Sequence, residues 1–276
     1  MNAEHMLRNS PESAGSGSRR TFTLSESALA SKNCVSRPNE RSRLAEEMRV
    51  IKQKLQWRLR GLRKSGIPGG RIPNTIMISS AEPDEGKSFV SLNLALSLGF
   101  ENIDVLLVDT DIANPTISNL LDIGPETGLL DLLDQENPVI EDVVLEDPKH
   151  SFAFLPSGRE ARVEAGLLAG PGMERVLHAM STAFPNHLLI IDTPPLLAAT
   201  EALVLSEHVS MVVLVVEANR TSESKLRAAI DLMESVPEVC ILLNKAPHRH
   251  IGNRLGDYYG VWTPAAAQGR TGNSTD

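Results

Sequence analysis

The chain has 276 residues, of which 41% are hydrophobic, and this is enough for one α/β domain of about 200 residues with additional terminal segments. Two cysteines, Cys34 and Cys240, are too few for a disulfide framework. No apolar run approaches the roughly 20 residues of a membrane helix, and the amino terminus lacks the apolar core of a secretory signal. We therefore expect a protein of the reducing cytoplasm. The net charge of −8 is uneven, because residues 1–72 carry 15 Lys and Arg against 6 Asp and Glu, whereas the remainder is strongly acidic.

The first 72 residues differ in composition from the rest of the chain. Residues 1–42 are rich in Ser, Asn, Glu and Arg without a sustained hydrophobic period, so we expect a disordered basic arm. Residues 43–72 are expected to form an oligomerisation helix from about Arg43 to Leu62, followed by a Gly-rich linker. This basic third is either solvated or a surface for an anionic membrane, nucleic acid or the acidic part of a neighbouring subunit.

From Thr75 onward, short apolar runs alternate with helical patterns. Strands are expected at residues 75–79, 104–108, 152–155, 187–191, 211–216 and 239–243. Helices are expected at residues 88–98, 172–182, 200–207 and 222–234, with shorter helical patches at 116–121, 128–134 and 139–145. The alternation predicts a three-layer α/β/α sandwich with a mainly parallel sheet at residues 73–247, followed by a flexible tail at residues 248–276.

A phosphate-loop pattern joins the first of these strands to its helix. It reads Ala81-x-x-x-x-Gly86-Lys87-Ser88, with Ala in place of the usual first Gly. Gly86 allows the backbone N–H groups to approach phosphates closely, and the helix directs its positive end at them. Lys87 is placed to reach the β- and γ-phosphates and Ser88 to hold Mg²⁺, so we expect the fold of a P-loop NTPase that binds ATP. The candidate nucleotide contacts are Ala81, Glu82, Pro83, Asp84, Glu85, Gly86, Lys87, Ser88 and Phe89.

Carboxylates end two further strands. Asp109 and Asp111 follow the strand at residues 104–108, and Asp192 follows the strand at residues 187–191. The carboxyl ends of parallel strands meet at one edge of a sheet, where carboxylates hold Mg²⁺ or accept a proton from an attacking hydroxyl. We expect Asp109, Asp192 and Ser88 to support the metal, and Asp111 to assist the metal or the acceptor hydroxyl. The expected catalytic residues are Lys87, Asp109, Asp111 and Asp192.

Two polar features lie near the end of the chain. Asn244 ends the last predicted strand and is equally well explained as an adenine contact or as a turn residue. The chain's two tyrosines, Tyr258 and Tyr259, lie together in a Gly-flanked segment beside Asp257, outside the predicted core. A mobile pair of this kind suits a phosphoacceptor site, and the alternative is a tail that packs back on the sheet.

Together these motifs resemble those of bacterial tyrosine kinases of exopolysaccharide synthesis, in particular the autokinases of exosortase (PEP-CTERM) loci. The resemblance extends from about Arg43 to Tyr259. It implies autophosphorylation of the C-terminal tyrosines with ATP and Mg²⁺, and control of polysaccharide chain length or export. It also implies a homo-oligomer such as a ring, a membrane-anchored co-polymerase partner, an opposing protein-tyrosine phosphatase, no specific nucleic acid, and a cytoplasmic position at the inner face of the membrane.

The sequence departs from that family's pattern in three places. Its oligomerisation pattern, Glu-x-x-Arg-x-x-Arg, corresponds here to Glu46, Arg49 and Lys52, and lysine lacks the bidentate fork of arginine. The family usually carries Arg soon after the second Asp of the Asp109-x-Asp111 motif, where this chain has Ala113 and Asn114. The tail has one tyrosine pair in place of a long cluster.

Two other functions remain open at this stage. One is a partitioning or septum-positioning ATPase, although Glu82 stands where such proteins carry a second lysine. The other is a nucleotide-gated scaffold of a polysaccharide export complex without kinase chemistry. Formation of phosphotyrosine separates the kinase from both alternatives, and ATP turnover separates the ATPase from the scaffold.

Overall fold

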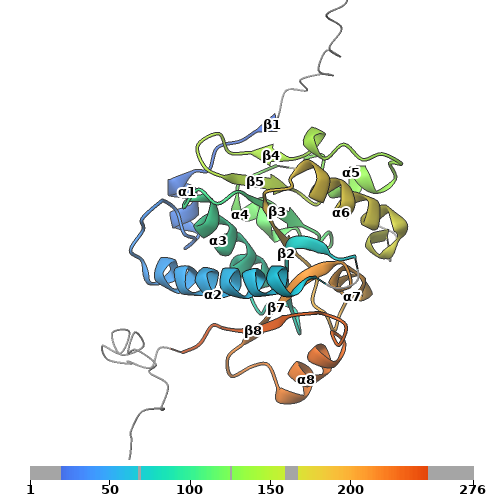
Figure 1. Cartoon of the computed structure of the whole chain (residues 1–276). Coiled ribbons are helices and arrows are strands. Elements are labelled where there is room, and N and C mark those ends of the chain that lie inside the picture. The colour runs from blue at the N-terminus through green and yellow to red at the C-terminus, as the bar shows by residue number, and fades with distance from the viewer. Residues whose placement is uncertain (1–19, 68–69, 125, 159–166, 248–276) are drawn as a thin grey trace, which may run out of the picture. The chain divides into compact units, whose positions relative to one another are not determined.

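The structure, a computed structural model, describes residues 20–67, 70–124, 126–158 and 167–247. The chain divides into a unit Met1–Lys245 and a second unit Ala246–Asp276, of which residues 246–247 are described. The first unit is a central sheet with helices on both of its faces (Figure 1). None of the helices in the described ranges is long and apolar enough to cross a bilayer.

Eight strands of the described residues form one sheet, in the order β1-β4-β5-β3-β6-β2-β7-β8. Their bounds are β1 Arg20–Thr21, β2 Ile72–Ser80, β3 Val105–Asp109, β4 Leu145–Glu146, β5 Phe152–Leu155, β6 Leu188–Asp192, β7 Val209–Glu217 and β8 Val239–Asn244. All pairs are parallel except β4 with β5. The predicted mainly parallel α/β fold is therefore confirmed, and the central strands are continuous Val, Ile and Leu runs because both of their faces are buried.

The helices divide between the two faces. On one face the core contains residues of α1 (Glu26–Ser31), α2 (Arg43–Ser65), α3 (Lys87–Gly99) and α4 (Thr116–Leu120). The other face is covered by α5 (Leu129–Leu133), η1 (Ile140–Asp142), η2 (Leu167–Ala169), α6 (Pro171–Ala183), α7 (Thr200–Ser206) and α8 (Glu223–Asp231). α3 is buried along almost its whole length, because α2 covers the side that the sheet leaves open.

The segment before α2 corrects the expectation of a disordered arm through residue 42. β1 pairs with β4, α1 follows, and Leu29, Cys34 and Val35 are buried in the core beside α3. A hydrogen bond to α3 helps to hold the segment, since the Asn93 side chain accepts from the Val35 N–H at 2.7 Å. The polar composition predicted disorder, but a few apolar residues are enough to order a segment when they pack on a surface that is already folded.

The predicted helical patch at residues 139–145 is also corrected. A single 3₁₀ turn occupies Ile140–Asp142, and Leu145 begins β4, which runs antiparallel to β5. Residues 139–145 are too few for the spacing of their apolar side chains to distinguish a helix from a strand. Other predicted strands and helices shift by a few residues at their ends, and α2 continues to Ser65 before Gly66 ends it.

Candidate nucleotide site

The phosphate-loop pattern lies between the end of β2 at Ser80 and the start of α3 at Lys87. Gly86 adopts a φ of +94°, and a Cβ there would also clash with the side-chain amide of Asn244, so both the conformation and the space require glycine. No side chain caps the first turn of α3. Its N–H groups therefore remain available for an anion, as a phosphate site requires.

The outer side of the loop is braced from β8 and from the β7–α8 connection. The buried Glu85 carboxylate accepts a hydrogen bond from the Glu82 N–H at 2.8 Å and one from the Thr221 hydroxyl. Asn244 Nδ2 donates to the Glu85 carbonyl at 2.9 Å, and Lys245 Nζ donates to the Asp84 carbonyl at 2.6 Å. The loop is thus held in shape by residues far away in sequence.

The predicted carboxylates meet below the loop because β3, β6 and β2 are neighbours in the sheet. Asp109 and Asp192 are paired residues at the ends of β3 and β6. Lys87 Nζ lies 2.5 Å from Asp111 Oδ2 and 3.9 Å from Asp192 Oδ2, and it donates to Ser88 Oγ at 3.1 Å. The structure therefore brings together all four expected catalytic residues and Ser88.

The charges of this strand-end site, which we define as Lys87, Asp109, Asp111 and Asp192, are buried. Burial raises the pKa of Asp192 to about 6, because removal from water outweighs the neighbouring Lys87 ammonium. Burial, together with the facing Asp192, also raises the pKa of Asp109 well above its ordinary value. Burial lowers the pKa of Lys87, but the Asp192 and Asp111 carboxylates outweigh it and leave the pKa raised, so the lysine stays charged.

Two oxygens of the strand-end site fit a divalent cation. Asp109 Oδ2 and Asp192 Oδ2 are buried and have no hydrogen-bond partner. Within the described residues no cluster of three or more His, Cys, Asp or Glu forms a complete metal site. The two oxygens fit Mg²⁺, which is usually held by one or two carboxylates together with waters and nucleotide phosphates.

Several residues of the site were not predicted. Ser91 Oγ donates to Asp192 Oδ1 at 2.8 Å, and Thr110 Oγ1 donates to the Asp192 carbonyl at 2.7 Å, so both position Asp192. Thr221 and Lys245 brace the loop. Ser91 lies four residues after Lys87, one helical turn along α3, and that spacing was the one signal that would have identified it.

The residues expected to mediate self-association do not share one exposed face. Arg49 pairs with Glu46 at 2.5 Å, and both lie at the surface of α2 or partly so. Lys52, by contrast, is only 2% exposed and forms an ion pair with Glu101, just after α3. The expectation that Lys52 belongs to an exposed oligomerisation face is corrected, because its long side chain lies against its own domain.

The other expected site residues are placed as follows. The Asn244 side chain contacts the phosphate loop, and its role toward adenine stays a prediction. Asn114 N–H donates to Asp111 Oδ1 at 3.2 Å, which helps to orient that carboxylate. Tyr258 and Tyr259 lie outside the described residues.

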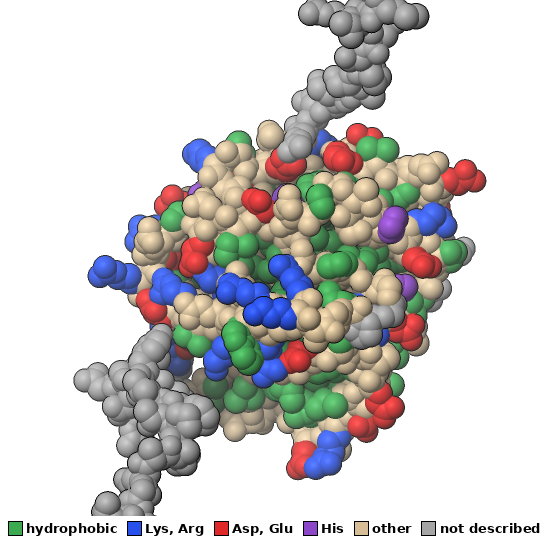
Figure 2. All heavy atoms as spheres, viewed as in Figure 1, with side chains coloured by type: hydrophobic (Ala, Val, Ile, Leu, Met, Phe, Trp, Pro, Cys, Tyr) green, Lys and Arg blue, Asp and Glu red, His purple; other side chains and the backbone are tan. Residues whose placement is uncertain are grey.

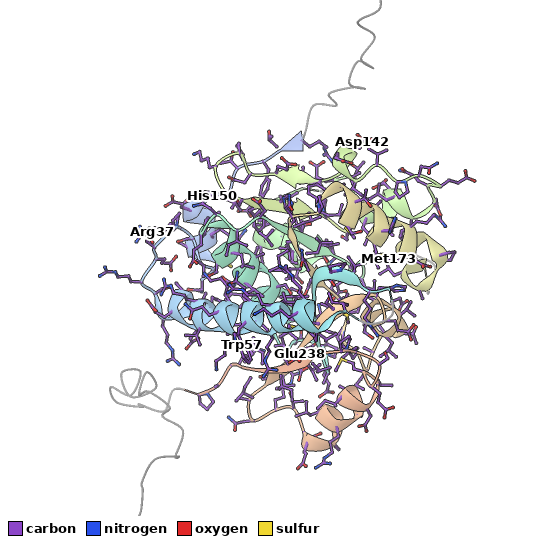
Figure 3. All side chains as sticks on the ribbon, viewed as in Figure 1. Arg37, Trp57, Asp142, His150, Met173 and Glu238 are labelled. Carbon is purple, nitrogen blue, oxygen red and sulfur yellow. The ribbon has the colours of Figure 1, made fainter. Side chains whose placement is uncertain are left out.

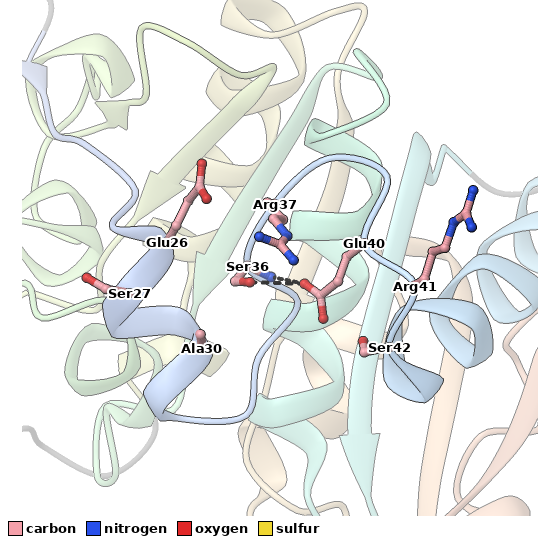
Figure 4. A pocket seen from close by; sticks show the side chains of 8 residues that line it. All are labelled: Glu26, Ser27, Ala30, Ser36, Arg37, Glu40, Arg41 and Ser42. Atoms are coloured by element: carbon pink, nitrogen blue, oxygen red, sulfur yellow. Dashed lines mark hydrogen bonds between the residues drawn. The ribbon is translucent and has the colours of Figure 1, made fainter.

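A separate hollow of about 640 Å³ lies between α1 and the start of α2 (Figure 4). The Glu40 carboxylate is held locally, since Ser36 donates to Glu40 Oε2 from its backbone N–H at 2.8 Å and from its hydroxyl at 3.0 Å. Neither the loop nor the strand-end carboxylates line it. We therefore do not assign the nucleotide to this hollow.

Comparison with known proteins gives a consistent result. Residues 71–243 match the ParA family, described as NUBPL iron-transfer P-loop NTPase. Tyrosine-protein kinase YwqD of Bacillus subtilis (strain 168) is 27% identical over 233 residues, which cover 83% of this chain and 92% of YwqD. The succinoglycan biosynthesis transport protein ExoP of Rhizobium meliloti (strain 1021) is 28% identical over 200 residues, which cover 70% of this chain and 25% of ExoP.

Among solved structures, the kinase domain of the Escherichia coli tyrosine kinase ETK has the same fold, with a TM-score of 0.66 at 23% identity and 86% of each chain covered. The relatives differ in length, since this chain spans 92% of YwqD but only 22% of the Acinetobacter johnsonii tyrosine-protein kinase ptk. The resemblance to bacterial tyrosine kinases is confirmed by these matches.

Proposed function

Since the chain belongs to the ParA-type P-loop NTPases and is a homologue of bacterial tyrosine-protein kinases, we propose that it is an ATP- and Mg²⁺-dependent protein-tyrosine autokinase. The observation that carries the proposal is the strand-end site, where one charged lysine and three buried carboxylates lie below an uncapped helix start. The iron-transfer role in the family's description is not part of the proposal. An iron–sulfur cluster needs several thiolates, and this chain has only Cys34 and Cys240.

The residues of the site have distinct roles in this proposal. The Lys87 ammonium, now paired with Asp111, neutralises negative charge on the γ-phosphoryl group during transfer. The unpartnered oxygens of Asp109 and Asp192, with Ser88 Oγ, would hold Mg²⁺, which supplies positive charge between the β- and γ-phosphates. The tyrosine oxygen forms the new bond to the γ-phosphorus, the bond to the β-γ bridging oxygen breaks, ADP leaves, and Asp111 accepts the hydroxyl proton.

We propose Tyr258 and Tyr259 as the acceptors and a neighbouring subunit as the donor of the phosphoryl group. Tyr258 lies fourteen residues after Asn244, the end of β8, and a flexible chain of that length spans roughly 20 Å. Each phosphate adds roughly −1.5 to −2 charges beside Asp257. On an acidic domain this charge favours dissociation of an oligomer, so phosphorylation would end a cycle of assembly.

The central experiment combines purified protein with labelled ATP and Mg²⁺ and then maps the labelled residue. Label on Tyr258 or Tyr259 supports the autokinase. ATP turnover without phosphotyrosine indicates an ATPase, and nucleotide binding without turnover indicates a scaffold. Either result contradicts the kinase proposal.

A mixing experiment tests transfer between subunits. Lys87→Met protein with an intact tail is incubated with Tyr258→Phe/Tyr259→Phe protein that retains its active site. Label on the Lys87→Met chain supports transfer in trans. Absence of label there, with wild-type labelling at a rate independent of concentration, contradicts it.

The biological setting is also part of the proposal. ExoP is by its name a transport protein of succinoglycan biosynthesis, which supports a role for this chain in polysaccharide synthesis or export. We propose a membrane-anchored co-polymerase as its partner and a tyrosine phosphatase as its antagonist, with the chain at the cytoplasmic face of the membrane. Self-association is proposed through the Glu46–Arg49 part of α2. A Glu46→Ala/Arg49→Ala variant that keeps the oligomeric mass of the wild type in light scattering contradicts this interface.

A further inference from the structure

The outer side of α2 changes its chemistry halfway along the helix. In the first half, charges of both signs neutralise one another, with Arg43 paired to Glu47 at 2.6 Å and Arg49 to Glu46 at 2.5 Å. After Glu47 the sequence has no Asp or Glu until Glu82. The exposed residues of the second half of the helix are therefore basic, apolar or uncharged polar, and none of them is acidic.

Six exposed residues form what we call the basic face of α2: Val50, Lys54, Trp57, Arg60, Gly61 and Lys64. Val50, Trp57 and Lys64 recur every seven residues, so they lie in one row along the helix, with Lys54 and Arg60 on either side of Trp57. Trp57 is 73% exposed, more than any other large hydrophobic side chain of the described residues. Figure 2 shows Lys and Arg side chains gathered over α2 with an apolar side chain beside them, and Figure 3 labels Trp57 on this side of the helix.

Two acidic groups that face α2 pair with cations outside the basic face. Glu238, on the strand side of the helix, pairs with Arg58, and Glu101 pairs with the buried Lys52. Asp104 lines a small hollow with Arg60 and Arg63 at the flank of the helix. Within the described part of the chain no ion pair engages Lys54, Arg60 or Lys64.

We propose that the basic face of α2 binds the surface of a bilayer that contains anionic phospholipids. A row of Lys and Arg with an interfacial Trp is the composition of protein surfaces that lie on anionic membranes. The basic face extends along α2 from Val50 to Lys64 and is therefore about 22 Å long, so it offers an extended edge on which the domain can rest. Its opposite side stays packed on the core, so the contact is shallow and reversible.

The composition favours a bilayer over the other anionic partners. The phosphate backbone of a nucleic-acid duplex would neutralise the cations. It offers no apolar phase, however, for Trp57 and Val50. An acidic face of a second copy would satisfy the charges, but its solvated carboxylates offer no apolar phase for Trp57. A bilayer interface accepts the indole and the cations together.

Co-sedimentation of the full chain with vesicles tests the proposal without any nucleotide. We expect binding to phosphatidylcholine vesicles that contain phosphatidylglycerol, no binding to pure phosphatidylcholine, and loss of binding at high salt. A Lys54→Glu/Lys64→Glu variant should bind at least about 25-fold more weakly, since each basic residue near the surface contributes roughly a fivefold factor. Lys149→Glu/Arg227→Glu makes the same change in net charge at exposed positions away from α2, and should retain binding.

Fluorescence locates the contact. In a Trp262→Phe background the emission comes from Trp57 alone, because the chain has two tryptophans. We expect it to shift to shorter wavelength with the anionic vesicles only. Trp57→Ala should weaken vesicle binding and leave the secondary structure unchanged, since the side chain is mostly exposed.

Each alternative has an outcome that overturns the proposal. Equal binding to neutral vesicles, or equal loss in both charge-reversal variants, excludes a specific basic face. A wild-type oligomer that dissociates on Trp57→Ala, without vesicle binding, assigns the face to a second copy of the chain. Binding to duplex DNA but not to anionic vesicles assigns it to nucleic acid.

Discussion

Charged side chains are concentrated in two regions of the molecule, and their surroundings differ. The strand-end site holds one lysine and three carboxylates out of water, at distances of a few ångströms. The basic face of α2 holds cations of one sign in water, with no partner among the described residues. Salt and solvent screen the second region strongly and the first hardly at all.

The comparison separates function from stability. Burial of the Asp109 and Asp192 carboxylates costs free energy in the folded chain, and a cation would give their Oδ2 oxygens, which have no hydrogen-bond partner, a counter-charge. The α2 cations cost almost nothing in the folded chain, because water solvates them. We therefore expect changes at the strand-end site to alter activity and stability strongly, and changes on α2 to alter interactions with other surfaces.

The largest effect is expected for Lys87→Met. Removal of the one cation at the γ-phosphoryl position should lower label transfer by about 10³-fold, the scale for a lost transition-state contact. Circular dichroism should show the fold retained. Lys225→Met is the matched control, because Lys225 pairs with Glu82 on the outer side of the same loop and should leave transfer within a few-fold. Undiminished transfer by folded Lys87→Met protein would contradict the site assignment.

Asp192→Asn should stabilise the nucleotide-free protein while it abolishes transfer. The folded pKa of Asp192, about 6, lies above the ordinary 3.8, so the folded chain holds the proton more tightly and loses stability as pH rises through that window. At about pH 7.5 the deprotonated carboxylate costs roughly 2–3 kcal/mol, which asparagine would recover. Urea unfolding of wild type and variant at about pH 7.5 measures this difference, and at about pH 5 the difference should be about half as large.

The control for that substitution is Asp147→Asn. Asp147 is also buried, but its carboxylate accepts hydrogen bonds from Leu24 N–H at 2.7 Å and Lys149 N–H at 2.8 Å. Asparagine cannot replace a carboxylate that accepts at both oxygens, so this variant should be destabilised by about 1–3 kcal/mol. The proposed difference is that Asp192 has one oxygen without a hydrogen-bond partner, whereas both oxygens of Asp147 accept hydrogen bonds. A change of stability in the same direction in both variants would contradict it.

The Mg²⁺-dependent part of ATP affinity should fall as pH is lowered. Below about pH 6 a cation must displace the proton of Asp192, so affinity should decline about tenfold per pH unit there. Nucleotide titration at several pH values, with Mg²⁺ and with EDTA, measures the effect. Affinity that is independent of pH would remove Asp192 from the metal site, and Asp192→Asn protein should show a weaker dependence.

Lys52→Ala should lower stability by about 1–2 kcal/mol without changing self-association, because the side chain pairs with Glu101 inside its own subunit. Lys54→Ala, two residues along the same helix and exposed, should leave stability within about 0.5 kcal/mol. Thermal unfolding and light scattering on both variants separate the two positions. A drop in oligomeric mass for Lys52→Ala alone would return Lys52 to the interface.

The smallest effect is expected for Arg60→Ala/Lys64→Ala. Both residues are exposed, so the free energy of unfolding should change by less than about 0.5 kcal/mol. Kinase activity in solution should be unchanged, whereas retention on anionic vesicles should fall. A large loss of stability would show that these cations support the fold and are not simply solvated by water.

The sequence predicted the parts of the fold with strong local signals. Strands such as β3 and β6 are uninterrupted apolar runs that end in Asp109 and Asp192, and parallel topology then places those carboxylates at one edge. The glycine at Gly86 was likewise predictable, because the loop requires its conformation. The edge of the sheet at which these carboxylates lie was therefore predictable, whereas the order of the strands was not.

Contacts that depend on tertiary packing were not predictable. Lys52 looked like a surface residue because charge normally indicates solvent, and only the approach of Glu101 shows otherwise. Residues 20–42 are ordered because they pack against α3. Such packing produces no hydrophobic periodicity in the sequence from which it could be predicted. Thr221 became a functional candidate only when its contact with Glu85 was known, whereas the helical spacing of Ser91 from Lys87 was a signal in the sequence.

The brace between β8 and the phosphate loop has a mechanical consequence. Asn244 and Lys245 donate hydrogen bonds to the carbonyls of Glu85 and Asp84. The two tyrosines follow these residues in the sequence. A displacement of Asn244 or Lys245 would break these hydrogen bonds and change the shape of the phosphate loop, because both side chains contact its backbone directly.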